Sequence, residues 1–248
     1  MVPALDAMTE SGAIYAMHKI CKSLSAAGFC AVAAVTAGLA APAEAKGQVS
    51  GRIQVTDAGG RPAQDLGNAV VYIEGRGPRV TGTRIDVALD ARQFRPRVVV
   101  IPAGTTINFP NQDPFNHNVF SVTERNDFDL GLYGRGETRE RRFSRAGLVR
   151  IYCNVHPRMT GAVVVRDNGW YSQPGADGSF SIADVPGGTY TITVWHERGG
   201  SASQQITVPS SGRLEDVVLP LDASTYQVVQ HKNKYGQEYG SGNTRERY

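Results

Sequence analysis

Beyond residue 46 the chain alternates apolar and polar positions in short runs, which Gly, Pro, Asn and Asp separate. A period of two over about 4–8 residues is typical of β-strands with one buried face. The 3.6-residue period of an amphipathic helix is not evident over any stretch longer than about ten residues. The pattern therefore predicts an all-β protein, with strands at 48–55, 69–74, 85–89, 98–101, 105–109, 117–122, 138–143, 148–153, 161–166, 179–182, 189–196, 203–208 and 214–220.

Residues 1–45 follow a different pattern. A positive segment at 17–22 precedes an alanine-rich apolar run at 23–40 and the small-x-small sequence Ala43-Glu44-Ala45. This order is typical of a secretory signal peptide with its cleavage site, and the apolar run is short for a membrane span. We expect removal of residues 1–45, export to the periplasm and no membrane insertion after cleavage. The alternative is an uncleaved membrane anchor.

Signal removal leaves Cys153 as the single cysteine of the mature chain, because Cys21 and Cys30 leave with the signal. A lone thiol in an oxidising compartment is disulfide-linked to a partner, buried and inert, or bound to a group that protects it. A metal-bound thiolate is an example of the third case.

The composition and charge of the chain mainly exclude certain classes of function. The net charge is only +3, and no dense Lys/Arg cluster with interleaved aromatics occurs, so we expect no nucleic-acid partner. No Ser-His-Asp or paired-carboxylate pattern has diagnostic spacing, so we do not expect an enzyme.

The chemistry is concentrated in a C-x2-H-x2-M run made of Cys153, His156 and Met159, with His117 upstream. A thiolate, two imidazoles and a weak thioether are the ligands of a type 1 (blue) copper site. Structural zinc sites usually take four Cys or His ligands, so the methionine favours copper. The mature chain has four histidines and one cysteine, too few for a trinuclear cluster or a cysteine-bridged binuclear centre.

Residues 84–167 resemble the cupredoxin family, and the ligand loop has the spacing of amicyanin. The resemblance rests on Phe94-x-Pro96, Pro102-Ala103-Gly104, Asn111, His117-Asn118, Phe143, Ala146-Gly147 and the Cys153-x2-His156-Pro157-x-Met159 run.

The resemblance implies a Greek-key β-sandwich with one type 1 copper ion, held by His117, Cys153, His156 and Met159. It also implies that Asn118 forms a hydrogen bond to the Cys153 loop, and that His156 is the electron port.

In the family the port lies in an apolar patch, to which we assign Pro114, Phe115 and Pro157. Arg158 departs from the amicyanin pattern, in which an aromatic residue stands in the loop. We expect its charge to favour an acidic redox partner, such as a cytochrome c or a periplasmic dehydrogenase, with added charge from Arg92, Arg95, Arg97, Arg139, Arg141 and Arg142.

The flanking segments resemble a second, smaller family, the carboxypeptidase regulatory-like (transthyretin-like) β-sandwich. The matching motifs are Val49–Asp57 with Arg61-Pro62, Ala69–Ile73, Gly175–Phe180 and Val185–Tyr190. We predict that residues 48–75 and 171–222 form this sandwich, with the copper domain inserted between them; two domains in tandem is the alternative.

Residues outside these motifs give weaker signals. Residues 223–248 are polar and predict a tail, in which His231 is solvated. For His196 we favour a structural role over a contact at the domain interface or a second metal site.

Together these features predict a periplasmic one-electron carrier. The alternatives are a copper-binding protein for tolerance or delivery, and a scaffold role for the second sandwich.

Overall fold

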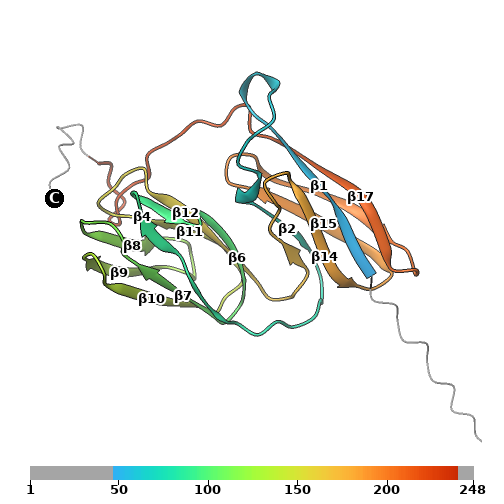
Figure 1. The fold of residues 1–248 in the computed structure, drawn as a ribbon, viewed down its shortest axis with the longest axis horizontal. Helices are drawn as coiled ribbons and strands as arrows, with labels where there is room; N and C mark the ends of the chain where they lie inside the picture. The colour runs from blue at the N-terminus through green and yellow to red at the C-terminus, as the bar shows by residue number, and fades with distance from the viewer. Residues whose placement is uncertain (1–46, 240–248) are drawn as a thin grey trace, which may run out of the picture. The chain divides into compact units, whose positions relative to one another are not determined.

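The computed structural model describes residues 47–239, so the expected signal peptide at 1–45 lies outside the described residues. Within 47–239 the chain forms seventeen strands and two short 3-10 turns, η1 (Ala58–Gly60) and η2 (Leu66–Asn68), and no α-helix. The expected all-β class, with two sandwiches, is confirmed (Figure 1). None of the described residues belongs to a helix long and apolar enough to cross a bilayer.

One sandwich, which we call the inner sandwich, contains ten consecutive strands. They are β3 (Arg84–Asp86), β4 (Ala88–Asp90), β5 (Gln93–Arg95), β6 (Val98–Pro102), β7 (Thr105–Pro110), β8 (His117–Ser121), β9 (Phe128–Tyr133), β10 (Thr138–Phe143), β11 (Gly147–Tyr152) and β12 (Thr160–Arg166). They form a five-stranded sheet in the order β6-β12-β11-β8-β9, a three-stranded sheet β10-β7-β3 and the pair β4-β5. The apolar positions of these strands fill one core, which includes the fully buried rings of Phe94, Phe109 and Phe143.

The outer sandwich is built from strands on both sides of the inner one in the sequence. They are β1 (Gly47–Thr56), β2 (Ala69–Ile73), β13 (Tyr171–Ser172), β14 (Ser179–Val185), β15 (Gly188–His196), β16 (Gly200–Val208) and β17 (Arg213–Asp222). Strand β1 lies between β14 and β17, and β2 lies between β13 and β15. Both sheets therefore combine segments from before and after the inner sandwich. The resemblance to the carboxypeptidase regulatory-like family stays a prediction.

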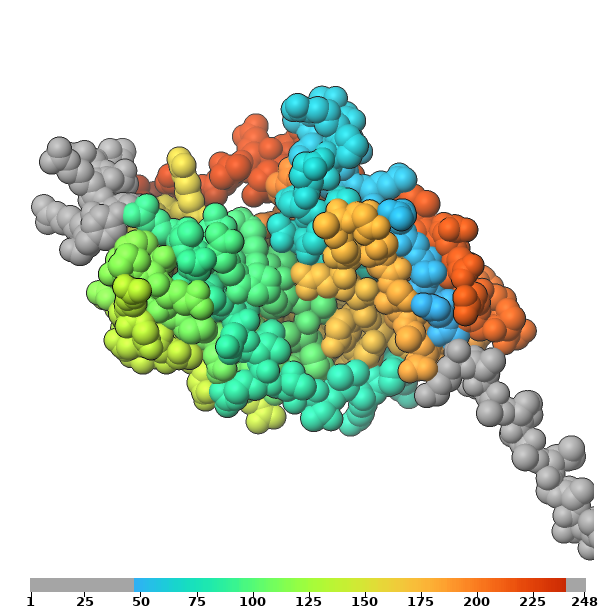
Figure 2. Space-filling view, viewed as in Figure 1, coloured from blue at the N-terminus to red at the C-terminus, as the bar shows by residue number. Residues whose placement is uncertain are grey.

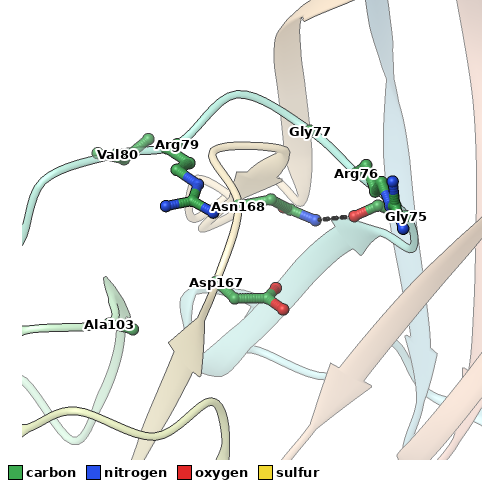
Figure 3. A pocket seen from close by; sticks show the side chains of 8 residues that line it. All are labelled: Gly75, Arg76, Gly77, Arg79, Val80, Ala103, Asp167 and Asn168. Carbon is green, nitrogen blue, oxygen red and sulfur yellow. Dashed lines mark hydrogen bonds between the residues drawn. The ribbon is translucent and has the colours of Figure 1, made fainter.

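Two linkers connect the sandwiches, and they bond to each other. The Asn168 side chain donates to the carbonyl of Gly75 (2.8 Å, Figure 3), and the Gly169 N–H donates to that of Pro78 (2.7 Å). A pocket opens beside them, lined by Gly75, Arg76, Gly77, Arg79, Val80, Ala103, Asp167 and Asn168.

The sandwiches also share a small apolar cluster of their own. It joins Val70 and Trp195 of the outer sandwich to Val98, Ala162 and Val164 of the inner one. Figure 2 shows the green inner and orange outer residues in contact.

An ion pair supports this contact. Glu197, just after β15, pairs with Arg97 just before β6 (2.5 Å), and Arg97 also donates to the Thr160 hydroxyl (2.6 Å). Since Thr160 follows Met159, this bond from Arg97 reaches the residue next to an expected ligand.

The observed strands differ from the predicted ones at a few places. The expected strand at 85–89 divides into β3 and β4, and β5, β9 and β13 were not expected. Strand β9 is at the edge of its sheet, where Phe128 and Leu130 are only partly buried against the core. It also contains Gly131, and glycine weakens the strand signal of a sequence segment.

Candidate metal centre

The loop between β11 and β12 carries three of the expected ligands. The two strands pair in antiparallel register up to Tyr152 and Thr160, so residues 153–159 form a closed connection. Within it the Cys153 N–H donates to the Met159 carbonyl (3.1 Å), and the Met159 N–H donates to the His156 carbonyl (2.9 Å). These bonds fix the loop before any metal is considered.

His117 joins the loop from the neighbouring strand. It is the first residue of β8, which pairs with β11 through Phe120 and Tyr152. Its Nδ1 lies 3.4 Å from the Cys153 Sγ, and the His156 Nδ1 lies 3.4 Å from the same sulfur. The three ligand atoms lie within 4.8 Å of one another, and all three residues are buried.

These distances suit a single metal ion. With metal–nitrogen bonds of about 2.0 Å and a metal–sulfur bond of about 2.3 Å, trigonal ligands lie roughly 3.5–3.7 Å apart. Met159, whose side chain is a thioether, is buried in the same core cluster as Cys153, and within residues 47–239 these two residues are the ones that carry sulfur. Two imidazoles, one thiol and a neighbouring thioether fit copper.

This geometry agrees with the family comparison. A family model of copper-binding proteins of the plastocyanin/azurin family matches residues 83–166. Residues 83–166 form a cupredoxin domain. Copper is the cofactor of this family.

Solved structures similar to the chain include other copper proteins. One is a Cu-containing nitrite reductase from Thermus scotoductus SA-01 (24% identity, TM-score 0.33), for which the match covers 38% of this chain and 25% of that one. Another is a purple cupredoxin from Nitrosopumilus maritimus (28% identity, TM-score 0.30, 34% of this chain and 99% of that one). A third is a reduced amicyanin variant (22% identity, TM-score 0.32, 39% and 98%). No curated relative matches the chain.

The environment of Cys153 in the cupredoxin domain keeps the free thiol protonated. Burial raises the pKa of the Cys153 thiol, while the backbone N–H groups of Asn118, Val155 and His156 donate toward the sulfur and lower it in part. Those donors are oriented to stabilise a thiolate, the form that binds a metal.

This environment predicts a pH-dependent copper affinity. Because the thiol of the metal-free protein is protonated at pH 7–8, each copper that binds must release that proton. The apparent affinity should therefore rise about tenfold per pH unit across this range. Competition against a chelator of known affinity at each pH measures the slope, and a flat profile would show that Cys153 does not lose a proton to the metal.

Asp113 is a site residue that the sequence analysis missed. Its Oδ2 lies 2.8 Å from the His117 Nε2 and also accepts the Arg92 N–H (2.9 Å), while Oδ1 accepts the Ala91 N–H (2.8 Å). Burial lowers the pKa of His117, although Asp113 opposes this, so the ring is neutral near pH 7. A neutral ring that donates from Nε2 leaves Nδ1 as the acceptor facing Cys153. In the sequence, the feature that could have identified Asp113 is an acidic residue four positions before a predicted histidine ligand.

Substitution of Asp113 should weaken the metal site. We expect Asp113→Asn to lower copper affinity by about 10–100-fold, since carboxylates that orient a histidine ligand typically contribute this much. Chelator competition measures it. Asp127→Asn, an exposed change in the same domain, is the control and should leave the affinity unchanged.

Asn118 contacts the Cys153 loop through its backbone N–H, which donates toward the Cys153 sulfur, and not through its side chain. Its side-chain amide donates to Asp129 (2.6 Å) and to the Gly131 carbonyl (2.9 Å), both in β9, rather than to the Cys153 loop. Its side-chain oxygen is buried without a partner in the described structure. Strand β9 draws the amide away because it pairs directly with β8. Only the backbone of Asn118 faces the sulfur.

Of the residues expected at the electron port, Phe115 lies beside His156. The Phe115 ring is 5.3 Å from both the His117 and the His156 rings, and the Arg92 guanidinium lies 5.0 Å over it. His156 is 7% exposed, Pro157 is half-buried and Arg158 is exposed.

Three of the other arginines expected to add charge are paired with carboxylates. Arg95 pairs with Asp90, Arg97 with Glu197, and Arg139 with Glu137. The Arg92 guanidinium lies over the Phe115 ring, and the Arg158 side chain is exposed.

The two remaining histidines have structural contacts. His196 is fully buried; its Nε2 lies 3.3 Å from the Asp65 carbonyl, and its Nδ1 accepts the N–H groups of Arg198 and Gly199. The expectation of a solvated His231 was wrong, because its ring packs 4.7 Å from that of Tyr152.

Proposed function

We propose that this protein is an exported one-electron carrier whose cupredoxin domain binds one type 1 copper ion through His117, Cys153, His156 and Met159. The observation that carries the proposal is the convergence of two imidazole nitrogens and the thiol sulfur within 4.8 Å in a buried loop. Bound copper supplies a Cu(II)/Cu(I) couple, which exchanges one electron without forming or breaking a bond to a substrate.

The chain itself contributes a rigid frame of strands that excludes water from the metal site. The antiparallel pair β11–β12 holds both ends of the ligand loop, β8 supplies His117, and Asp113 orients it. A frame that keeps its geometry when the metal changes charge lowers the reorganisation that electron transfer requires. The small exposed fraction of His156 provides a short path to a partner while excluding water from the sulfur.

Spectroscopy of the copper-loaded protein tests the site. We expect an intense thiolate-to-copper absorption band and a narrow copper hyperfine splitting in electron paramagnetic resonance, both absent in Cys153→Ser. The electron-carrier role then requires rapid, reversible exchange with a small inorganic oxidant and with an acidic cytochrome c. A blue protein that exchanges electrons with neither, but passes copper to a chelating acceptor, would instead favour copper tolerance or delivery.

The partner is proposed to be an acidic redox protein, such as a cytochrome c or a periplasmic dehydrogenase. Phe115 and Pro157 offer an apolar contact around His156, and Arg92 and Arg158 place positive charge beside it. This combination suits brief, electrostatically steered encounters.

The association rate with such a partner should depend on salt. It should fall as ionic strength rises from about 0.01 M to 0.1 M, because the Debye length shrinks from about 30 Å to about 10 Å. Arg158→Gln should flatten this dependence in stopped-flow measurements, whereas Arg213→Gln, in the outer sandwich, should not. A wild-type rate that does not change with salt would contradict an acidic partner.

A further inference from the structure

The chain continues beyond the outer sandwich in a segment that returns to the cupredoxin domain. We call residues 224–239 the C-terminal strap; it follows β17 and is drawn in red in Figures 1 and 2. Its start is anchored in the outer sandwich, where the Ala223 N–H donates to the Thr56 carbonyl (2.8 Å). Its middle is solvated, since Val228 and Val229 are 80% and 77% exposed.

The far end of the strap bonds through Lys234 to the Cys153 loop directly and to the His117 strand by way of Asp129. The Lys234 N–H donates to the side-chain oxygen of Asn154 (2.9 Å), the residue after Cys153. The Lys234 ammonium donates to Asp129 (2.5 Å), whose other carboxylate oxygen accepts the Asn118 amide (2.6 Å). A continuous chain of hydrogen bonds therefore runs from the residue beside His117 to the residue beside Cys153.

Two further strap residues contact the same loop. The Tyr239 hydroxyl lies 3.4 Å from the Cys153 carbonyl and 3.2 Å from that of Asn154. The His231 ring packs against Tyr152, and its Nε2 lies 3.4 Å from the His156 carbonyl. The strap thus contacts backbone oxygens of both Cys153 and His156.

We propose that the C-terminal strap is a clasp on the copper site and that Lys234 is its positioning residue. Lys234 connects the two ligand-bearing segments, which the Asn118 side chain does not connect. The inference rests on the proposed copper ligands. It assigns the outer sandwich a role, because that sandwich anchors the start of a strap whose far end limits movement and water entry at the Cys153 loop.

Thiol accessibility tests the clasp without copper. In the exported protein, where Cys153 is the single thiol, Lys234→Met keeps the side-chain stem and removes the charge. Because the pair is partly exposed and such pairs contribute no more than about 1 kcal/mol, its loss should let the loop open up to about fivefold more often. Labelling of Cys153 by a thiol reagent should accelerate by that factor. The control is Lys232→Met, which removes a strap lysine paired with Glu238 of the strap itself.

Spectroscopy of the copper-loaded variants separates positioning from general stability. Lys234→Met should shift the reduction potential and the copper hyperfine splitting, Lys234→Arg should restore both, and Lys232→Met should match the wild type. Tyr239→Phe should show the same changes to a smaller extent, and it remains informative if Lys234→Met does not fold.

Equal labelling rates and equal potentials for Lys234→Met and the wild type would overturn the clasp. A wild-type protein without the blue band would instead refute the proposed function, while the labelling rates of the metal-free variants would still decide whether the strap holds the loop.

Discussion

Phe109→Ala should lower the free energy of unfolding of the cupredoxin domain by about 3–5 kcal/mol, the usual result of truncating a fully buried phenylalanine. The Phe109 ring is 0% exposed and packs edge-on against Phe94 at 6.4 Å. Its carbonyl accepts the hydroxyl of Tyr133 (3.0 Å), which ties β7 to β9 across the core. Because strands on both sides hold the surrounding side chains in place, the cavity left by removing the Phe109 ring should not close.

The two sandwiches can be followed separately in denaturant. Both tryptophans of the chain, Trp170 and Trp195, lie in or beside the outer sandwich, whereas Cys153 lies in the cupredoxin core. Urea titration of metal-free protein, read by thiol labelling of Cys153, reports the cupredoxin domain, and tryptophan fluorescence reports the outer sandwich. We expect Phe109→Ala to move the first transition more than the second.

Leu132→Ala is the matched control for this change. Leu132 lies in β9 of the same domain and is 57% exposed, so its truncation should alter stability by no more than about 0.5 kcal/mol. If Phe109→Ala had an equally small effect, the core around Phe109 would have to repack without a cavity.

Gly51→Ala should destabilise the outer sandwich by about 3 kcal/mol or more, because it forces two strands apart. A Cβ atom at Gly51 would lie 1.9 Å from the carbonyl oxygen of Val217, a backbone atom that cannot rotate away. Gly51 and Val217 are partners in the parallel pairing of β1 with β17. Alanine would thus break the pairing that joins the start of the described chain to its last strand.

Tryptophan fluorescence in urea measures the effect of Gly51→Ala. Gly67→Ala is the control, since the nearest atom to its added Cβ would be 3.8 Å away, an ordinary contact. We expect Gly51→Ala to lower the fluorescence midpoint strongly and Gly67→Ala to change it little. Similar midpoints for both variants would contradict the close approach of β1 to β17. Unfolding of the outer sandwich would also release the start of the strap. We therefore expect Cys153 to be labelled faster in Gly51→Ala than in the wild type.

Several features of the site could be predicted from the sequence because they are local. The Cys153, His156 and Met159 spacing lies within one loop, and strands with one buried face, such as β7 and β14, show their period directly. His117 lies on a different strand and was predicted because the loop supplies only three of the four ligands. The structure brings His117, Cys153 and His156 together as expected.

Other features depend on which strands lie side by side, and a linear pattern does not contain that information. The Asn118 amide bonds to β9 because β9 pairs with β8. The need for glycine at position 51 exists only because Val217 lies against it.

The sequence by itself determined the all-β class and predicted a copper ligand set of which the structure brings His117, Cys153 and His156 together, because periodicity and ligand spacing act over a few residues. Only the tertiary structure decided that β1 joins β14 and β17, that Asp113 orients His117, and that the strap reaches the ligand loop. The physical reason is that each of these features depends on hydrogen bonds or packing between surfaces that meet only once the whole chain has folded. The polar residues of the strap that bond to the loop are of the same kinds as those of a solvated tail.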